Sequence, residues 1–229
     1  MMTEVKTASP RHKLLSIVGM AAIGMLTACG DGGSSEAPLS PTTVGRAKAN
    51  STTLCFNAVG LANKSDAELF AASIAGDARR VEQSIDAGGN VNATDFLKRT
   101  PLFAAAFCNH PEVANLLIGK GSDVNARDFL GMSPLHAAVA MGCDAAAKAL
   151  ILKSAQINIQ DNRGHSPLHL AAATNQMAMV KLLLEHGADA QVRDKDGVTA
   201  ASLASDNGHK LVVATINKWH EKQKNSIQK

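Results

Sequence analysis

The chain has 229 residues, no tyrosine and a single tryptophan, and aromatic residues make up only 3% of it. Proteins that bind single-stranded nucleic acid stack the bases on aromatic rings, so this composition does not support such a platform. The sequence also lacks G-x-S-x-G, H-E-x-x-H, C-x-x-C and a glycine-rich phosphate loop. It therefore predicts no enzyme, no cofactor, no metal site and no small-molecule substrate.

A strong charge of one sign is also missing. The chain has 23 basic and 20 acidic residues and a formal net charge of +3. Residues 1–28, which we expect to be removed (below), hold three basic residues and one acidic residue, so 20 basic and 19 acidic residues remain. A net charge of +1 gives no electrostatic footprint for nucleic acid.

What the sequence does contain is an internal repeat of 33 residues. The segment Ser-Pro-Leu-His-Leu-Ala-Ala beginning at Ser166 has one copy beginning at Ser133 and another at Thr100. Weaker copies begin at Ala67 and Thr199. Two further columns keep the same register: Asp95, Asp128, Asp161 and Asp194, and Gly76, Asn109, Gly142, Asn175 and Gly208.

Each unit predicts two helices followed by a turn. Ser166 before Pro167 is typical of a helix start, and Asn175 tolerates the left-handed conformation that ends a helix. A second helix is expected over residues 176–185, where apolar residues recur at helical spacing. One unit alone buries little surface, so neighbouring units must stack to form a continuous core.

The pattern T/S-P-L-H-x-A-A with a 33-residue period resembles the ankyrin repeat, over about residues 63–219. The resemblance implies an all-α repeat solenoid of about five stacked ankyrin repeats, each a helix-turn-helix plus a hairpin loop. It also implies that the motif histidines, His136 and His169, form hydrogen bonds within the hairpins and are not metal ligands. The departures from the motif are Phe103 and Ser202 in place of the histidine, and Lys98 and Ser154 in place of hairpin glycines. At Lys98 and Ser154 the sequence therefore does not predict the local geometry of the hairpin.

The N-terminus has the features of a secretory signal. A basic start leads into an apolar run over residues 14–28 that is too short to span a bilayer comfortably. The run ends in Leu26-Thr27-Ala28-Cys29, which resembles the lipobox of bacterial lipoproteins. This resemblance implies cleavage before Cys29, acylation of that cysteine and a periplasm-facing protein anchored by lipid in the bacterial envelope. Because no aspartate directly follows Cys29, the outer membrane is favoured over the inner.

The predicted organisation follows from these features. Residues 1–28 are the lipoprotein signal peptide, 29–53 the acylated cysteine and a flexible tether, 54–62 an apolar N-terminal capping segment, 63–220 the ankyrin-repeat domain and 221–229 a polar C-terminal tail. A closing helix is expected over residues 210–223, with Trp219 packed on the fifth repeat.

Three cysteines remain once Cys29 carries lipid, and the sequence does not assign them. An oxidising compartment permits one disulfide, either Cys108 with Cys143 or Cys55 with Cys108, and leaves a third thiol over. The alternative is three thiols.

The resemblance implies a protein-binding module whose partner contacts the hairpin tips and the exposed ends of the first helices, which form the concave face. At these positions the first repeats are apolar and the last are polar. Exposed apolar patches mark partner sites, with aromatic anchors favoured, whereas the alternative is that Phe96 and Phe129 pack between adjacent hairpins. Arg99 and Arg163 are expected to meet acidic groups of the partner. The expected partner-binding residues are Phe96, Leu97, Arg99, Phe107, Phe129, Leu130, Met132, Met141, Asn162, Arg163, His165, Lys195 and Asp196.

We therefore predict a non-enzymatic, protein-binding lipoprotein of the bacterial envelope. Similarity to envelope ankyrin proteins paired with type VI secreted effectors favours an immunity protein that neutralises a toxin such as a phospholipase, by analogy at the level of the fold. The alternative is a scaffold for an envelope enzyme, for example in oxidative-stress defence.

Overall fold

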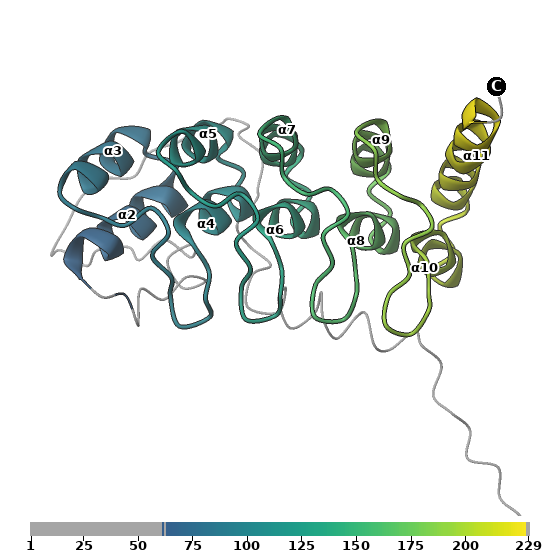
Figure 1. Ribbon diagram of the computed structural model, residues 1–229, viewed down its shortest axis with the longest axis horizontal. Coiled ribbons are helices and arrows are strands. Elements are labelled where there is room, and N and C mark those ends of the chain that lie inside the picture. Colours follow the sequence, from purple (N-terminus) through teal and green to yellow (C-terminus); the bar gives the residue numbers. More distant parts are fainter. Residues whose placement is uncertain (1–60, 62, 228–229) are drawn as a thin grey trace, which may run out of the picture.

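The computed structural model describes residue 61 and residues 63–227. The described residues form ten helices arranged in five pairs (Figure 1). The inner helices are α2 (Lys64–Ala75), α4 (Pro101–Phe107), α6 (Pro134–Ala140), α8 (Pro167–Ala173) and α10 (Ala200–Asp206). The outer helices are α3 (Ala78–Asp86), α5 (Pro111–Gly119), α7 (Asp144–Leu152), α9 (Met177–Glu185) and α11 (Lys210–Ile227).

The pairs stack into an elongated solenoid, which confirms the predicted all-α repeat architecture. Each inner helix packs on the inner helices of the neighbouring pairs, and the outer helices form a second row behind them. The hairpin loops project from the opposite side of the inner row (Figure 1). Within the described residues there is no β-strand, only one isolated bridge between Arg193 and Thr199.

The inner helices begin where their sequence predicts. The Thr100 hydroxyl accepts a hydrogen bond from the Phe103 backbone N–H at 3.2 Å, and Pro101 occupies the first helical position. Ser133 and His136 form a capping box at the start of α6. These caps satisfy backbone donors that a helix start leaves without an intrahelical acceptor.

The two positions where glycine is replaced keep the geometry of the repeat. Lys98 has φ of 59° and Ser154 has φ of 63°, both in the left-handed region that the glycines of their columns also occupy. A side chain in this region costs free energy because the Cβ atom crowds the backbone. The replacements therefore add strain without altering the course of the chain.

The main core lies between the two rows of helices. Leucines at one position of the first four inner helices, Leu69, Leu102, Leu135 and Leu168, are at most 1% exposed. Buried alanines fill the spaces between adjacent inner helices, where larger side chains would hold the helices apart. A second, smaller apolar cluster lies on the inner helices of the first repeats.

The C-terminal helix differs from its prediction in length. It begins at Lys210, as predicted, and continues to Ile227, beyond the predicted end at residue 223 and into the segment described as a polar tail. Trp219 is partly buried and packs against the main core. Within the described part of the chain, none of the helices combines the length and apolarity that crossing a bilayer requires. The predictions for the signal peptide, Cys29 and the tether, and for residues 54–60 and 62, lie outside the described residues.

Candidate functional site: the row of hairpin tips

The hairpin tips of consecutive repeats form one connected row, which we call the hairpin ridge. It comprises residues 95–99, 128–132, 161–165 and 194–198. Each tip after the first donates a backbone N–H to a carbonyl of the tip before it. The bonds run from Phe129 to Leu97 (2.8 Å), from Asn162 to Leu130 (2.9 Å) and from Lys195 to Arg163 (3.0 Å). Because the tips are tied to one another, the ridge is a preformed surface.

An aspartate closes each tip from inside, which explains the aspartate column of the sequence. The Oδ1 atom of Asp128 accepts the backbone N–H groups of Leu130 and Met132, each at 2.8 Å. Asp95, Asp161 and Asp194 do the same in their own repeats. Burial raises the pKa of Asp128, and the backbone hydrogen bonds and Arg99 offset part of this rise.

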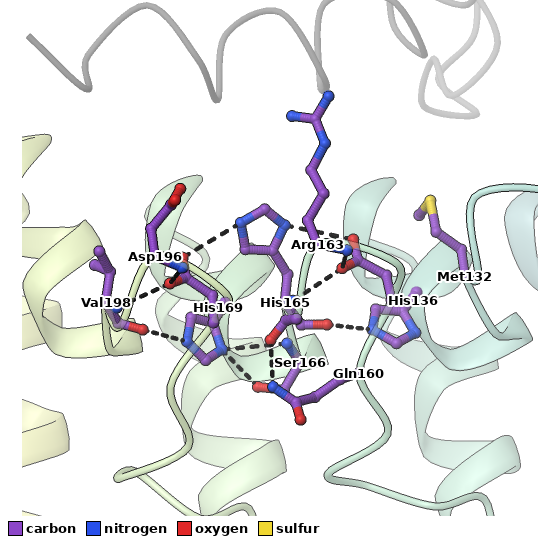
Figure 2. A network of polar contacts seen from close by, with 12 residues as sticks. Met132, His136, Gln160, Arg163, His165, Ser166, His169, Asp196 and Val198 are labelled. Atoms are coloured by element: carbon purple, nitrogen blue, oxygen red, sulfur yellow. Dashed lines mark hydrogen bonds and ion pairs between the residues drawn. The ribbon is translucent and has the colours of Figure 1, made fainter.

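The apolar end of the ridge is exposed as predicted. The side chains of Phe96, Phe129 and Leu130 are 56%, 65% and 51% exposed. The alternative, that the two phenylalanines pack between hairpins, is therefore wrong. The half-buried predicted residues are Leu97, Met132 and Met141, and the exposed ones at the polar end are Asn162, Arg163, Lys195 and Asp196. Figure 2 shows the Arg163 side chain extending away from the buried polar network.

Three residues predicted on the accessible face are buried, and these predictions are wrong. The Arg99 guanidinium turns into its own tip, where Nε and Nη2 donate to Asp95 Oδ2 at 2.8 and 2.6 Å. It is therefore not exposed to acidic groups of a partner. His165, the last residue of its tip, is only 5% exposed, and Phe107 lies in the second apolar cluster and is 7% exposed.

The motif histidines form hydrogen bonds, as the resemblance implied, but these bonds link consecutive hairpins as well as groups within one repeat (Figure 2). His136 Nδ1 accepts the backbone N–H of Ser133 at 3.1 Å, which places the proton on Nε2. Nε2 then donates to the carbonyl oxygen of His165, in the next hairpin, at 3.0 Å. His169 repeats the arrangement one unit later, with Val198 as acceptor at 3.1 Å. Burial lowers the pKa of His136 to about 4 and lowers the pKa of His169.

His165 occupies a different position from the motif histidines, between two carboxylates. Its Nδ1 lies 3.4 Å from Asp161 Oδ2 and its Nε2 lies 3.6 Å from Asp194 Oδ2. Burial alone would raise the pKa of Asp161, but hydrogen bonds from His165 and from the Arg163 backbone outweigh it, and the pKa is lowered. The ring therefore bridges the third and fourth tips of the ridge, residues 161–165 and 194–198.

Metal-binding geometry is not found in the part of the chain that the structure describes, where no three His, Cys, Asp or Glu side chains are placed to hold an ion. Of the two disulfides that the sequence left open, the pair Cys108 and Cys143 is not bonded. Instead the buried Cys143 thiol donates to the Phe107 carbonyl oxygen at 3.4 Å. The alternative pairing involves Cys55, which lies outside the described residues.

A family model described as ankyrin repeats, in three copies, matches residues 69–161 and 145–226. The chain belongs to the ankyrin-repeat family. Ankyrin repeats are protein-interaction modules and are typically not enzymes, which gives this chain a role in protein–protein interaction and a protein as its partner. A comparison with curated proteins finds no match.

The second apolar cluster of the ankyrin domain is a feature that sequence reasoning missed. Its signal was present, because Phe70 and Phe103 stand 33 residues apart at the position of the motif histidine. Two aromatic residues in place of a hydrogen-bonding histidine indicate that the first two repeats bury apolar surface where the later repeats place a polar network.

Proposed function

We propose that this protein is a lipid-anchored envelope protein whose hairpin ridge binds a protein partner through its apolar end. The observation that carries the proposal is the group of three large apolar side chains, Phe96, Phe129 and Leu130, each more than half exposed on two adjacent tips. Aromatic and aliphatic anchors of this kind contribute most of the binding free energy at protein interfaces. Exposed apolar groups that cluster mark a partner site more strongly than single ones do.

The fixed geometry of the ridge favours binding further. Backbone hydrogen bonds between tips already hold Phe129 and Leu130 in place, so association does not have to order a loop. Exposed cations also lie on the ridge, at Lys98 within the apolar end and at Arg163 and Lys195 beyond it. Within the described residues no carboxylate lies within ion-pair distance of these three side chains. A partner with an apolar patch bordered by acidic groups fits this surface.

The class of partner that we favour is a secreted antibacterial effector, such as a phospholipase, which this protein would neutralise as an immunity protein. Three features support this proposal: a recognition fold, a sequence without common catalytic motifs, and an N-terminus that resembles a lipoprotein signal. An envelope anchor would place the ridge in the compartment that such effectors attack. A secreted lipase-like protein encoded beside this one would be the first candidate partner, whereas a catalase-like neighbour would favour a scaffold.

Truncation of single anchors tests the binding surface. Phe129→Ala and Leu130→Ala should each weaken capture of the partner by about 2 kcal/mol, roughly thirtyfold. The folding stability should change by only about half a kcal/mol, because these side chains are exposed. Leu152→Ala is the matched control, since Leu152 is 65% exposed but lies on the outer helix α7. Equal binding by all three variants would place the partner site elsewhere.

The anchor has its own test. Because Cys29 is the proposed acceptor of the lipid, Cys29→Ser should abolish labelling by a fatty-acid analogue and release the protein from the membrane fraction. Circular dichroism of the released protein should still show the helical repeat domain. Labelled, membrane-bound Cys29→Ser protein would refute the proposed lipid anchor at Cys29. The proposal that the hairpin ridge binds a partner does not depend on this result.

A further inference from the structure

The hairpin ridge separates its charges by depth. It has one aspartate at the start of each tip, and each of these accepts two backbone N–H groups of its own tip, so the carboxylates face inward. Lys98, Arg163 and Lys195 are exposed, and Asp196 is the exposed acidic residue of the ridge. Residues 63–227 hold as many basic as acidic residues. The outward face of the ridge is nevertheless basic, because most of its carboxylates are turned inside.

Two further arginines stand beside the tips and are held there. Arg193 Nη1 donates to the Gly197 carbonyl oxygen at 2.7 Å, and Arg127 Nη2 donates to the carbonyl oxygen of Gln160, which precedes the third tip. A Cβ atom at Gly131 would lie 2.8 Å from Arg127 Nη2, so glycine at that position leaves room for the guanidinium. Both arginines are exposed, and a guanidinium has further N–H donors beyond the one used in such a bond. A guanidinium already held in place loses less side-chain entropy when it binds a carboxylate.

The ridge changes from apolar to basic between its second and third tips. The positions of Phe129 and Leu130 are taken by Asn162 and Arg163 one repeat later. The exposed cations beyond this change form what we call the basic end of the ridge: Arg127, Arg163, Arg193 and Lys195. Neighbouring helices pack about 8 to 10 Å apart, so the third and fourth tips lie roughly 10 and 20 Å beyond Leu130. A partner that contacts both parts needs carboxylates at that distance from its apolar groups.

We infer that the partner of the ridge presents an acidic protein segment, with apolar side chains on Phe129 and Leu130 and carboxylates on the basic end. This inference rests on the proposed function, because it names the chemistry of a partner for the same ridge. Carboxylates match the basic end because an arginine can donate two parallel hydrogen bonds to one carboxylate. The charges would also set the direction in which the segment lies along the ridge.

An anionic membrane or a nucleic acid fits this surface less well. Either would bring an array of phosphates against the basic end, where the exposed Asp196 would repel them. The exposed apolar side chains lie on the first two tips, apart from most of the cations. A protein segment can place apolar and acidic groups separately, whereas a sheet or strand of like phosphates cannot.

Fluorescence anisotropy with a labelled peptide tests the chemistry of the partner. The peptide carries two leucines, a spacer of about four residues and a run of glutamates, because an extended chain covers about 3.3 Å per residue. At low salt Arg163→Glu and Lys195→Glu should each weaken binding by at least about tenfold, and added salt should weaken binding to the parent protein. Lys148→Glu is the matched control, because Lys148 is exposed on the outer helix α7. It should alter binding by less than about twofold, since salt screens a distant charge.

Matched peptides and other polyanions complete the test. A peptide with glutamine in place of glutamate, and one with the leucines inside the glutamate run, should each bind at least about tenfold more weakly. Equal binding by the glutamine peptide, or no binding by the acidic one, would overturn the inference, while the proposed function keeps its separate test by partner capture. If Phe129→Ala weakens binding but Arg163→Glu does not, the apolar site stands and the acidic partner is wrong. Tighter binding to phosphatidylglycerol vesicles or to a DNA duplex, lost in Arg163→Glu, would overturn the inference in favour of that polyanion.

Discussion

His136 is a fully buried titratable residue, and it couples folding to pH. Its pKa is about 4 in the folded chain, against an ordinary value of 6.5, because burial disfavours the charged ring. As the pH falls below 6.5, His136 becomes protonated in the unfolded chain. In the folded chain it stays neutral until the pH reaches about 4. Stability is therefore complete above pH 6.5 and falls toward pH 4. The lowered pKa of His169 acts in the same direction, whereas the raised pKa of Asp128 opposes it.

We predict that His136 alone removes about 3 kcal/mol of stability between pH 6.5 and pH 4. His136→Phe, which copies Phe103 of the preceding repeat, should be less stable at neutral pH but should lose less stability on acidification. Urea unfolding at several pH values measures both effects. Leu135→Val serves as the control, because it removes buried apolar volume and no titrating group. An unaltered pH slope in His136→Phe would contradict the assignment.

Arg99 contributes to stability through its contact with Asp95. The Asp95 side chain is 1% exposed and the Arg99 side chain 6% exposed, so the pair is shielded from solvent. Removing the cation alone leaves a buried carboxylate without this compensation. Arg99→Ala should therefore lower the free energy of unfolding by about 3 to 5 kcal/mol, as measured by urea denaturation.

The matched control for Arg99 is the exposed pair of Arg80 and Glu68. Their charged groups are 3.7 Å apart and both side chains are 48% exposed. Because solvent screens such pairs, Arg80→Ala should cost less than about 1 kcal/mol. Similar losses of unfolding free energy in the two arginine variants would mean that burial does not determine how much the pair of Arg99 and Asp95 stabilises the fold.

The repeat register predicted which residues reach the hairpin tips, but not which way their side chains turn. Phe96, Phe129 and Leu130 lie exposed as predicted. Arg99 and His165 occupy equivalent positions and turn inward, because Asp95 in one case and Asp161 with Asp194 in the other attract their side chains. The direction of a side chain depends on contacts within and between repeats, and these contacts cannot be deduced from the residue's position in the repeat.

Two helices were predicted with residue ranges, and their starts were well predicted because helix starts depend on residues close in sequence. For α9 the prediction over residues 176–185 agrees with Met177–Glu185 in the structure. The C-terminal end of α11 was placed at residue 223 and lies at Ile227. Polar residues beyond Trp219 gave no stop signal and no apolar stripe, so the sequence carried little information on where this helix ends.

The turns that follow the outer helices contain one serine in a column of glycines. Ser154 has φ of 63°, while Gly88, Gly121 and Gly187 in its column have φ of 92° or 93°. Ser154→Gly should raise stability by about 0.5 to 1 kcal/mol by removing the cost of a Cβ atom in the left-handed region. Gly121→Ser should lower it by a similar amount, because a Cβ atom there meets no atom within 4 Å and only the backbone cost remains.

Thermal unfolding of these two variants beside the parent gives the sign of each change. Ser154→Gly also loosens the unfolded chain, which works against the gain. A loss of stability in Ser154→Gly together with a gain in Gly121→Ser would show that the left-handed conformation is not the controlling factor at this column.

The stacking of the repeats was predictable because one unit cannot bury its own apolar face. What the register could not supply is the difference between the two ends of the solenoid. The first two repeats bury Phe70 and Phe103 where the third and fourth bury His136 and His169. The N-terminal end is thus held by apolar contacts, and the centre by hydrogen bonds that pass from hairpin to hairpin.

The main helix contacts lie within a pair or between neighbouring pairs. In such an array each repeat is stabilised mainly by itself and by its direct neighbours. We predict that the two ends respond separately to core truncation. Leu69 in α2 and Ile216 in α11 are 0% and 1% exposed, so Leu69→Ala and Ile216→Ala should each cost about 2 to 5 kcal/mol. Trp219, the single tryptophan, reports only on the C-terminal end. Ile216→Ala should lower the urea midpoint of Trp219 fluorescence more than that of the helical circular dichroism signal, and Leu69→Ala should do the reverse. Equal shifts of both signals in both variants would mean that the five repeats unfold as one cooperative unit, in which coupling between neighbours exceeds the cost of either truncation.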